Sequence, residues 1–390
     1  MQKEHVVINK LSFRIHHRSQ EDHTNLPSGE MEDLIPVEDP ALWTAATHGQ
    51  TETVLQLLAE GADINEKGGP DENAPWQSTP SQKSTSLYQA VRRGFNDTAR
   101  VLLQHEAEVS AQDGNGETSL HMAVVNSREG MKGNAGEVLE KNVEALDVVK
   151  LLLQYGANVS VQNNEGLTSL HRAVDACHDK FFKLEVVRLL PAHGADPFAE
   201  DNDGNTPLHT VAEHGEKEMA LLLIEKGVEV SVKNSTGHTP LHLSVYSDED
   251  PAYEGDEEMA LLLLEQGADV SAKCNDGNTS LHGSAASGHW VMVRMLLDQS
   301  ADVSSENNDG KTPLDLCADR TNIPWVPTWR HEEVAALLLA EETRRVTWGA
   351  FTMGQHARLG AGSRVMTLHP ELILDRVEPE DSLETCLTLS

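Results

Sequence analysis

Small apolar residues and leucines recur along the chain in a fixed order. A short segment of small residues, such as VAEHG at 211–215, is followed by a leucine-rich segment, such as EMALLLIEKG at 218–227. The second segment ends in glycine, the residue that typically stops a helix, and an extended piece such as ADVS comes next. Each unit therefore predicts a turn, a short helix, a longer helix and a β-like finger.

A threonine opens each unit and sets the period. The threonines are Thr85, Thr118, Thr168, Thr206, Thr239, Thr279 and Thr312, separated by 33, 50, 38, 33, 40 and 33 residues. PALW at 40–43 is a degenerate earlier copy. Because a unit of this size cannot bury its apolar face alone, we expect the units to stack into one solenoid. Eight units are predicted, starting near residues 40, 85, 118, 168, 206, 239, 279 and 312.

The variants of TPLH, the glycine stop and the ADV finger recur together in register, and the chain from about 40 to 341 resembles the ankyrin repeat. Three of the spacings equal its 33-residue period. The resemblance implies an all-α solenoid of stacked helix-turn-helix units with short β-hairpin fingers. We predict an N-terminal arm at 1–39, the repeat domain at 40–341, and a C-terminal helical cap with an acidic tail at 342–390.

The net charge of the chain limits the classes of partner that it can bind. It has 63 acidic and 30 basic residues and a formal net charge of -33, which opposes contact with a phosphate backbone. Its four cysteines are far apart and form no CxxC pair, so neither a disulfide framework nor a zinc module is indicated. No apolar run is long enough to cross a membrane. We expect a soluble, monomeric protein of the cytoplasm or nucleus that binds neither nucleic acid nor membranes.

A histidine follows the threonine by three residues in five units, at His121, His171, His209, His242 and His282. Histidine is often used for proton transfer and metal ligation, but here the threonine is placed to cap a helix and the histidine to reach back to that cap. The resemblance implies a second bond to the backbone of the neighbouring repeat. Burial there would keep the ring neutral. Since a stacking residue must be present in every unit and a catalytic residue need not be, we favour the structural interpretation.

Some positions depart from the repeat. Glu106 and Ser300 occupy the stop-glycine position, so we expect their helices to end differently. Pro191 falls inside a second helix and should end or kink it one turn early. The fingers carry serine where the family usually has asparagine, and only Asn65 keeps it. GADIN at 61–65 resembles the sequence that asparaginyl hydroxylases modify, so Asn65 is either a hydroxylation site or an ordinary finger residue.

No GxSxG, HExxH, phosphate-loop, GxGxxG or kinase motif occurs. We therefore predict no enzyme activity, no catalytic residues, no cofactor and no metal site. The resemblance implies a binding protein whose contacts come from the finger tips and the exposed ends of the first helices. The helix-end candidates are Arg92, Arg93, Val125, Asn126, Asp175, Glu213, His214 and Tyr246, and those just before the threonines are Glu117, Leu167, Asn205, His238, Asn278 and Lys311.

Insertions lengthen several repeats. Four of them fall between the first and second helix, around 127–142, 177–182, 247–258 and 320–332, and should lie along one edge of the solenoid. The insertion at 247–258 is acidic enough to attract a basic peptide, or is a solvated charge run. A further insertion, at 67–84, lengthens the first finger.

The segment TWGAFTMGQHARLG at 347–360 predicts a separate amphipathic helix after the last repeat. It resembles a tail found after repeats in proteins of unicellular eukaryotes, with the pattern FxMGxHxRLGxxSxV. We interpret the chain as a non-enzymatic scaffold that binds partner proteins on its finger and inner-helix face. The alternative is a substrate adaptor of a ubiquitin ligase, in which the C-terminal segment recruits the ligase.

Overall fold

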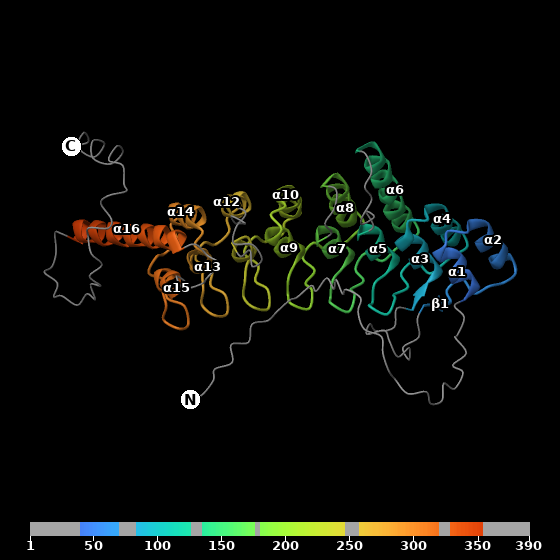
Figure 1. Ribbon diagram of the computed structural model, residues 1–390, viewed down its shortest axis with the longest axis horizontal. Coiled ribbons are helices and arrows are strands. Elements are labelled where there is room, and N and C mark those ends of the chain that lie inside the picture. Colours follow the sequence, from blue (N-terminus) through green and yellow to red (C-terminus); the bar gives the residue numbers. More distant parts are fainter. Residues whose placement is uncertain are drawn as a thin grey trace, which may run out of the picture. The chain divides into compact units, whose positions relative to one another are not determined.

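The computed structural model describes residues 40–69, 83–125, 135–175, 180–245, 257–319 and 328–353. Within these ranges the chain folds into consecutive helix pairs joined by finger-like loops (Figure 1). The expected N-terminal arm, residues 1–39, and the tail from 354 onward lie outside the described residues. No helix among the described residues is both long and apolar enough to cross a membrane.

Each pair has a short first helix and a longer second helix. The first helices are α1 (Ala41–Thr47), α3 (Ser86–Arg93), α5 (Ser119–Val125), α7 (Ser169–Asp175), α9 (Pro207–Glu213), α11 (Pro240–Leu243), α13 (Ser280–Ser287) and α15 (Pro313–Asp319). The second helices are α2 (Thr51–Ala59), α4 (Asn96–Gln104), α6 (Ala135–Gln154), α8 (Lys180–Ala192), α10 (Lys217–Glu225), α12 (Glu257–Glu265), α14 (Trp290–Asp298) and α16 (Thr328–Met353). The predicted all-α solenoid is confirmed.

The helices stack in two layers with one continuous core between them. First helices contact the next first helix, as α5 contacts α7 and α7 contacts α9, while second helices form their own row. The leucine of the TxLH motif is fully buried in this core in repeat after repeat, at Leu120, Leu170, Leu208, Leu241 and Leu281. Stacking therefore buries the apolar face that a single pair would leave exposed.

The first finger carries the two short strands of the described chain. β1 (Lys67–Gly68) pairs antiparallel with β2 (Ser84–Thr85), with Lys67 opposite Thr85. The ring of Trp43 packs on Gly68, and its Nε1 donates to Ser84 Oγ at 3.3 Å. The predicted lengthening of this finger is confirmed at its base, although residues 70–82 are outside the described chain.

The prediction that Glu106 and Ser300 end their helices differently is wrong. Glu106 and Ser300 adopt the same left-handed backbone as the stop glycines, with φ of 65° and 69°. Their helices end like the others because the hydrogen bonds after the helix are the same: the N–H of Ala107 reaches the carbonyl of Leu102, as that of Val228 reaches Leu223. Pro191 does not end α8 early either. The helix continues to Ala192, two residues before its stop glycine, as α10 and α12 do.

The predicted separate helix near 347 is also replaced by a different arrangement. The second helix of the last repeat, α16, runs without interruption from Thr328 to Met353, across the expected boundary at 341/342. In α10 the stop glycine comes four residues after the buried Leu223, whereas four residues after the buried Leu338 of α16 stands Glu342. The extension is held by Arg345, which donates to the carbonyl of Ala301 at 2.8 Å and to Glu341 at 2.9 Å.

Candidate partner-binding face

The threonine, leucine and histidine of the TxLH motif form the buried frame of the repeats, which supports the exposed residues of the binding face. The N–H of Thr206 donates to Nδ1 of His209 at 3.1 Å, and Nε2 of the same ring contacts the carbonyl of His238 in the next finger at 3.1 Å. Because Nδ1 accepts a bond from an amide, Nε2 carries the proton and donates. The rings of the other four motif histidines make the same pair of contacts, His121 with Leu167, His171 with Asn205, His242 with Asn278 and His282 with Lys311.

Burial lowers the pKa of each of these histidines, to about 4 for His121, His209 and His242. The structural interpretation of the motif is therefore confirmed, since every ring is neutral and fully engaged between two repeats. In the last repeat Asp315 replaces the histidine and accepts bonds from the Thr312 N–H at 2.9 Å and from its hydroxyl at 2.8 Å. A carboxylate thus caps this helix, but unlike the histidine ring it has no N–H to donate to a neighbouring finger.

In most fingers one polar side chain closes the turn. Asp201 Oδ1 accepts from the N–H groups of Asp203 and Asn205 at 2.9 and 2.7 Å. Asp113, Asn163, Asn234 and Asn307 do the same in their own fingers. In the remaining finger of this series the position is held by Cys274, which is buried. A thiol is only a weak acceptor, so this turn lacks the stabilisation of the others.

Replacing Cys274 with asparagine should stabilise the array by about 1 kcal/mol, because a carboxamide oxygen can accept from the N–H groups of Asp276 and Asn278. The opposite change, Asn307→Cys, should destabilise it by a similar amount. Urea unfolding of both variants measures the effect. A Cys274→Asn protein no more stable than Cys274→Ser would contradict the assignment of this turn.

Several predicted contact residues also take part in the frame. Asn205 Oδ1 accepts from Asn234 Nδ2 at 2.8 Å, and Asn278 Oδ1 accepts from Asn307 Nδ2 at 2.8 Å. These side chains join consecutive fingers. Only the atoms of Asn205 and Asn278 that are not used in these bonds between fingers can therefore contact a partner.

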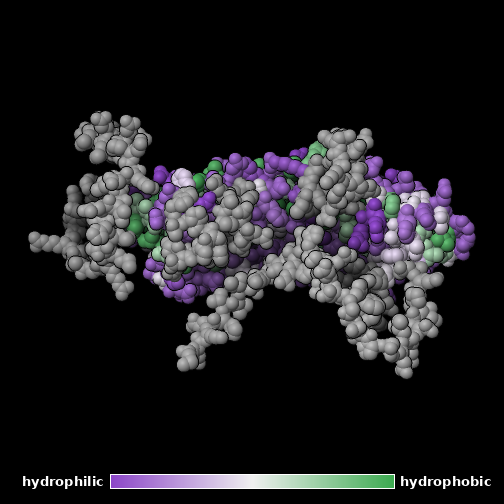
Figure 2. All heavy atoms as spheres, viewed as in Figure 1, coloured by the Kyte–Doolittle hydropathy of each residue, from purple (hydrophilic) through white to green (hydrophobic). Residues whose placement is uncertain are grey.

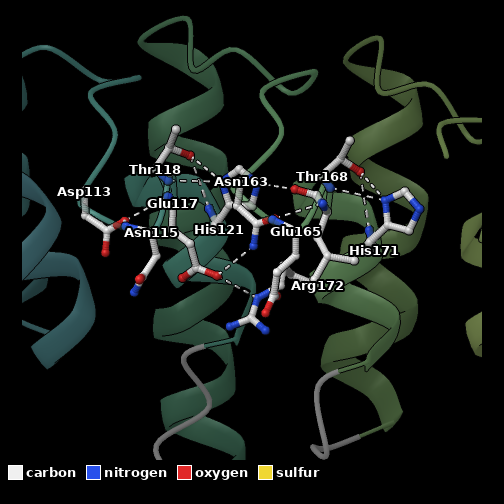
Figure 3. A network of polar contacts seen from close by, with 12 residues as sticks. Asp113, Asn115, Glu117, Thr118, His121, Asn163, Glu165, Thr168, His171 and Arg172 are labelled. Atoms are coloured by element: carbon white, nitrogen blue, oxygen red, sulfur yellow. Dashed lines mark hydrogen bonds and ion pairs between the residues drawn. The ribbon is translucent and has the colours of Figure 1, made fainter. Parts of the chain in front are cut away.

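Glu117 is the most deeply engaged of the predicted contact residues. It is only 7% exposed, and its Oε1 lies 3.1 Å from Nε of Arg172 in the next repeat and 3.4 Å from Nδ2 of Asn163 (Figure 3). Burial raises the pKa of this carboxyl even though Arg172 opposes the shift. Glu117 and Arg172 thus form an ion pair on the finger side of the first helices.

A small hollow of about 180 Å³ lies beside this pair. It is lined by Tyr88, Gln89, Arg92, Asp113, Asn115, Glu117 and Met122. The hollow brings together two predicted contact residues, Arg92 and Glu117, that are 25 positions apart in the sequence. Burial and the neighbouring Asp113 carboxylate raise the pKa of the Tyr88 hydroxyl, which therefore stays protonated. A hollow of this size can receive one side chain of a partner.

Comparison with known families decides what kind of array this is. A model of ankyrin repeats matches residues 42–133, 177–273 and 250–346, and a second ankyrin model matches 144–179. The chain belongs to the ankyrin-repeat family. Ankyrin repeats are protein–protein interaction modules, so the face described above belongs to a binding array.

The ankyrin array is similar to parts of two larger proteins. It is 30% identical over 100 residues to Rabankyrin-5 of Mus musculus and 32% identical over 72 residues to Rabankyrin-5 of Homo sapiens. These matches span 26% and 18% of the chain but only 8% and 6% of those proteins. Among solved structures, the crystal structure of the ankyrin repeat domain of Bcl-3 is 27% identical, with a TM-score of 0.46, over 59% of this chain and 92% of that one.

The remaining predicted residues are spread along the ankyrin array. Arg92, Arg93, Asp175, Glu213 and His214 are exposed at the ends of their first helices, and His214 Nε2 lies 3.9 Å from Asp175 Oδ1 of the preceding repeat. Those that are half-buried are Val125, Leu167, Asn205, His238, Asn278 and Lys311. Asn126 and Tyr246 lie outside the described residues.

Sequence reasoning missed Arg172 as a member of this face. The position directly after the motif histidine holds Met122, Arg172, Thr210 and Leu243, all half-buried, and then Gly283, which is buried. This variation beside a recurring histidine is the signal that could have identified the position. Within the described residues no group of three or more histidine, cysteine, aspartate or glutamate side chains could hold a metal ion.

The fingers explain why serine can replace asparagine. Asn65 Oδ1 accepts from the N–H of Glu108 in the next repeat at 2.8 Å. Ser110 Oγ accepts the corresponding bond from Asn158, and Ser231 Oγ from Asp269, both at 2.9 Å. Either residue therefore links consecutive fingers. Asn65 itself is exposed, and its hydroxylation stays a prediction.

Proposed function

We propose that the array is a scaffold that binds one or more partner proteins along the face formed by its finger tips and the exposed ends of its first helices. The observation that carries this proposal is the contrast between the buried motif residues and the exposed residues at the helix ends. The threonine, leucine and histidine of the motif recur and are buried, whereas the helix-end positions are exposed and differ chemically, from Arg92 to Asp175 to Glu213. A surface whose exposed residues differ between repeats, while the buried residues recur, can be specific for a partner.

The composition of the surface favours a partner with basic segments. The chain carries a formal net charge of -33, and in the view of Figure 2 most of the described surface is hydrophilic, with hydrophobic residues confined to separate small areas. Complementary charge accelerates association and selects among partners more than it adds affinity. The hollow lined by Arg92 and Glu117 provides a local anchor within this acidic surface.

Affinity capture with a matched pair of variants tests the proposal. The face variant combines Arg92→Ala, Arg93→Ala and Glu213→Ala, and the control combines Arg188→Ala, Arg294→Ala and Glu225→Ala, which are exposed on second helices. Both lose the same side-chain types. We expect at least one protein to be recovered by wild type and control and to fall about tenfold or more with the face variant, because interface arginines often dominate binding energy. Equal recovery of every protein by all three would contradict the proposed face.

A further inference from the structure

The array has a second concave feature, on the edge opposite the fingers. A groove of about 370 Å³ lies between α4 and α6, with the turn before α2 at one end. The α6 residues that line it run from Glu144 to Leu151, all after the insertion at 127–142. Figure 1 shows α6 projecting beyond its neighbours on the side away from the fingers.

The apolar part of this groove is small. Phe95 is half-buried with its ring directly against Gly49, whereas Val148 and Leu151 are buried. The Thr51 and Thr98 hydroxyls are hydrogen-bonded to each other at 2.8 Å. The exposed part of the Phe95 ring can accept the aliphatic stem of one long side chain.

The rim of the groove is acidic. Asp97 projects from the first turn of α4, and Glu144 and Asp147 project from α6. All three carboxylates are exposed, and Asp147 Oδ1 lies 3.8 Å from Nζ of Lys150, which is itself half in solvent. Arg100 is the single basic side chain among the lining residues. The lining thus has a net formal charge of two negative units.

We propose that this groove binds a short basic segment of a partner protein, with lysine or arginine head groups against Asp97, Glu144 and Asp147 and one aliphatic stem on the exposed part of Phe95. Lysine and arginine combine an apolar stem with a cationic head, which matches Phe95 and the rim of the groove. A second copy of the chain is a poor occupant because each copy carries a formal net charge of -33. This surface is separate from the finger face, so its partner can bind at the same time.

A synthetic peptide provides the probe. A nine-residue fluorescein-labelled peptide of alternating lysine and valine, capped at both ends, is titrated with the full chain at physiological ionic strength and followed by fluorescence anisotropy. The site variant combines Asp97→Asn, Glu144→Gln and Asp147→Asn and should weaken binding about tenfold, as expected for three partly exposed ion pairs. Arg100→Gln should strengthen binding by about twofold to fivefold for the same reason.

The matched control removes three exposed carboxylates elsewhere, with Glu225→Gln, Glu229→Gln and Glu265→Gln. Less than about threefold weakening in this control, together with the opposite effects of the site variant and of Arg100→Gln, supports the groove. Equal weakening by both triple variants would show general attraction to an acidic protein and would overturn the proposal. The same conclusion follows if a peptide with glutamate in place of lysine binds equally well, or if the wild type shows no saturable binding.

Discussion

Lowering the pH from 7.5 to 5.5 should destabilise the array by about 4 kcal/mol, because His121, His209 and His242 each resist protonation in the folded state. Their pKa values are about 4 when folded, against 6.5 in an unfolded chain. The folded protein keeps its full stability above pH 6.5, and each histidine lowers the free energy of unfolding as the pH falls from 6.5 toward 4. At pH 5.5 this loss is about 1.4 kcal/mol for each histidine.

The cause of the shift is geometric as well as dielectric. In the folded array Nδ1 of His209 accepts from the Thr206 N–H at 3.1 Å while Nε2 contacts the next carbonyl. A second proton on Nδ1 would face that N–H and break the cap, and the charge would be buried. His171 and His282, whose pKa values are also lowered by burial, add to the effect in the same direction.

Urea unfolding at the two pH values and constant ionic strength measures the effect. In His209→Gln, where glutamine can still cap the helix, the pH dependence should shrink by about 1.4 kcal/mol. The exposed His193→Gln serves as the control and should retain the dependence of the wild type. Ordinary carboxylates remain ionised at pH 5.5, so relief of charge repulsion does not mask the result. Equal stability at both pH values would contradict the neutral, engaged histidines.

The period and the motif were enough to predict the fold, because the same local chemistry recurs in every repeat. The Thr–x–x–His spacing predicted the cap, the resemblance to the ankyrin repeat implied the bond to the next repeat, and His209 makes both contacts. Helix ends were less predictable. Glu106 carries a left-handed backbone at a cost, and its turn keeps the bond of the glycine turns, from the N–H of Ala107 to the carbonyl of Leu102. The residue type at this one position therefore does not show where the helix ends.

The candidate site was predictable as a face but not as a set of contacts. Glu117 and Arg172 are 55 positions apart, and a 50-residue step between their threonines separates them, so nothing local pairs them. The groove between α4 and α6 was likewise unpredictable, because Asp97 and Glu144 come from different repeats and no local pattern places them beside one groove. Only the structure shows that the second half of the insertion at 127–142 belongs to α6.

Substitution of one finger glycine should be far more damaging than substitution of a helix-stop glycine in the same repeat. Gly237 and Gly227 both have positive φ, 77° and 90°. A Cβ at Gly237 would lie 2.7 Å from the backbone nitrogen of Asn275, whereas a Cβ at Gly227 would have nothing within 4 Å. We expect Gly227→Ala to cost about 1 kcal/mol from backbone strain alone, and Gly237→Ala to cost about 3 to 4 kcal/mol.

The larger cost arises because the atom that must move belongs to the backbone of the next finger. The N–H of Asn275 donates to the carbonyl of Thr236 at 3.0 Å, and this bond is part of the link between the two repeats. Moving Asn275 away would lengthen this bond, so the added methyl group would weaken the interface between two repeats rather than a single turn.

The last finger offers an internal control for this argument. Gly310 occupies the same finger position as Gly237, with φ of 73°, but a Cβ there meets no described atom within 4 Å. Gly310→Ala should therefore behave like Gly227→Ala in urea unfolding, although its sequence context matches Gly237. If Gly310→Ala and Gly237→Ala were equally destabilising, the turn conformation alone would explain the glycines, and the close approach of neighbouring fingers would play no part.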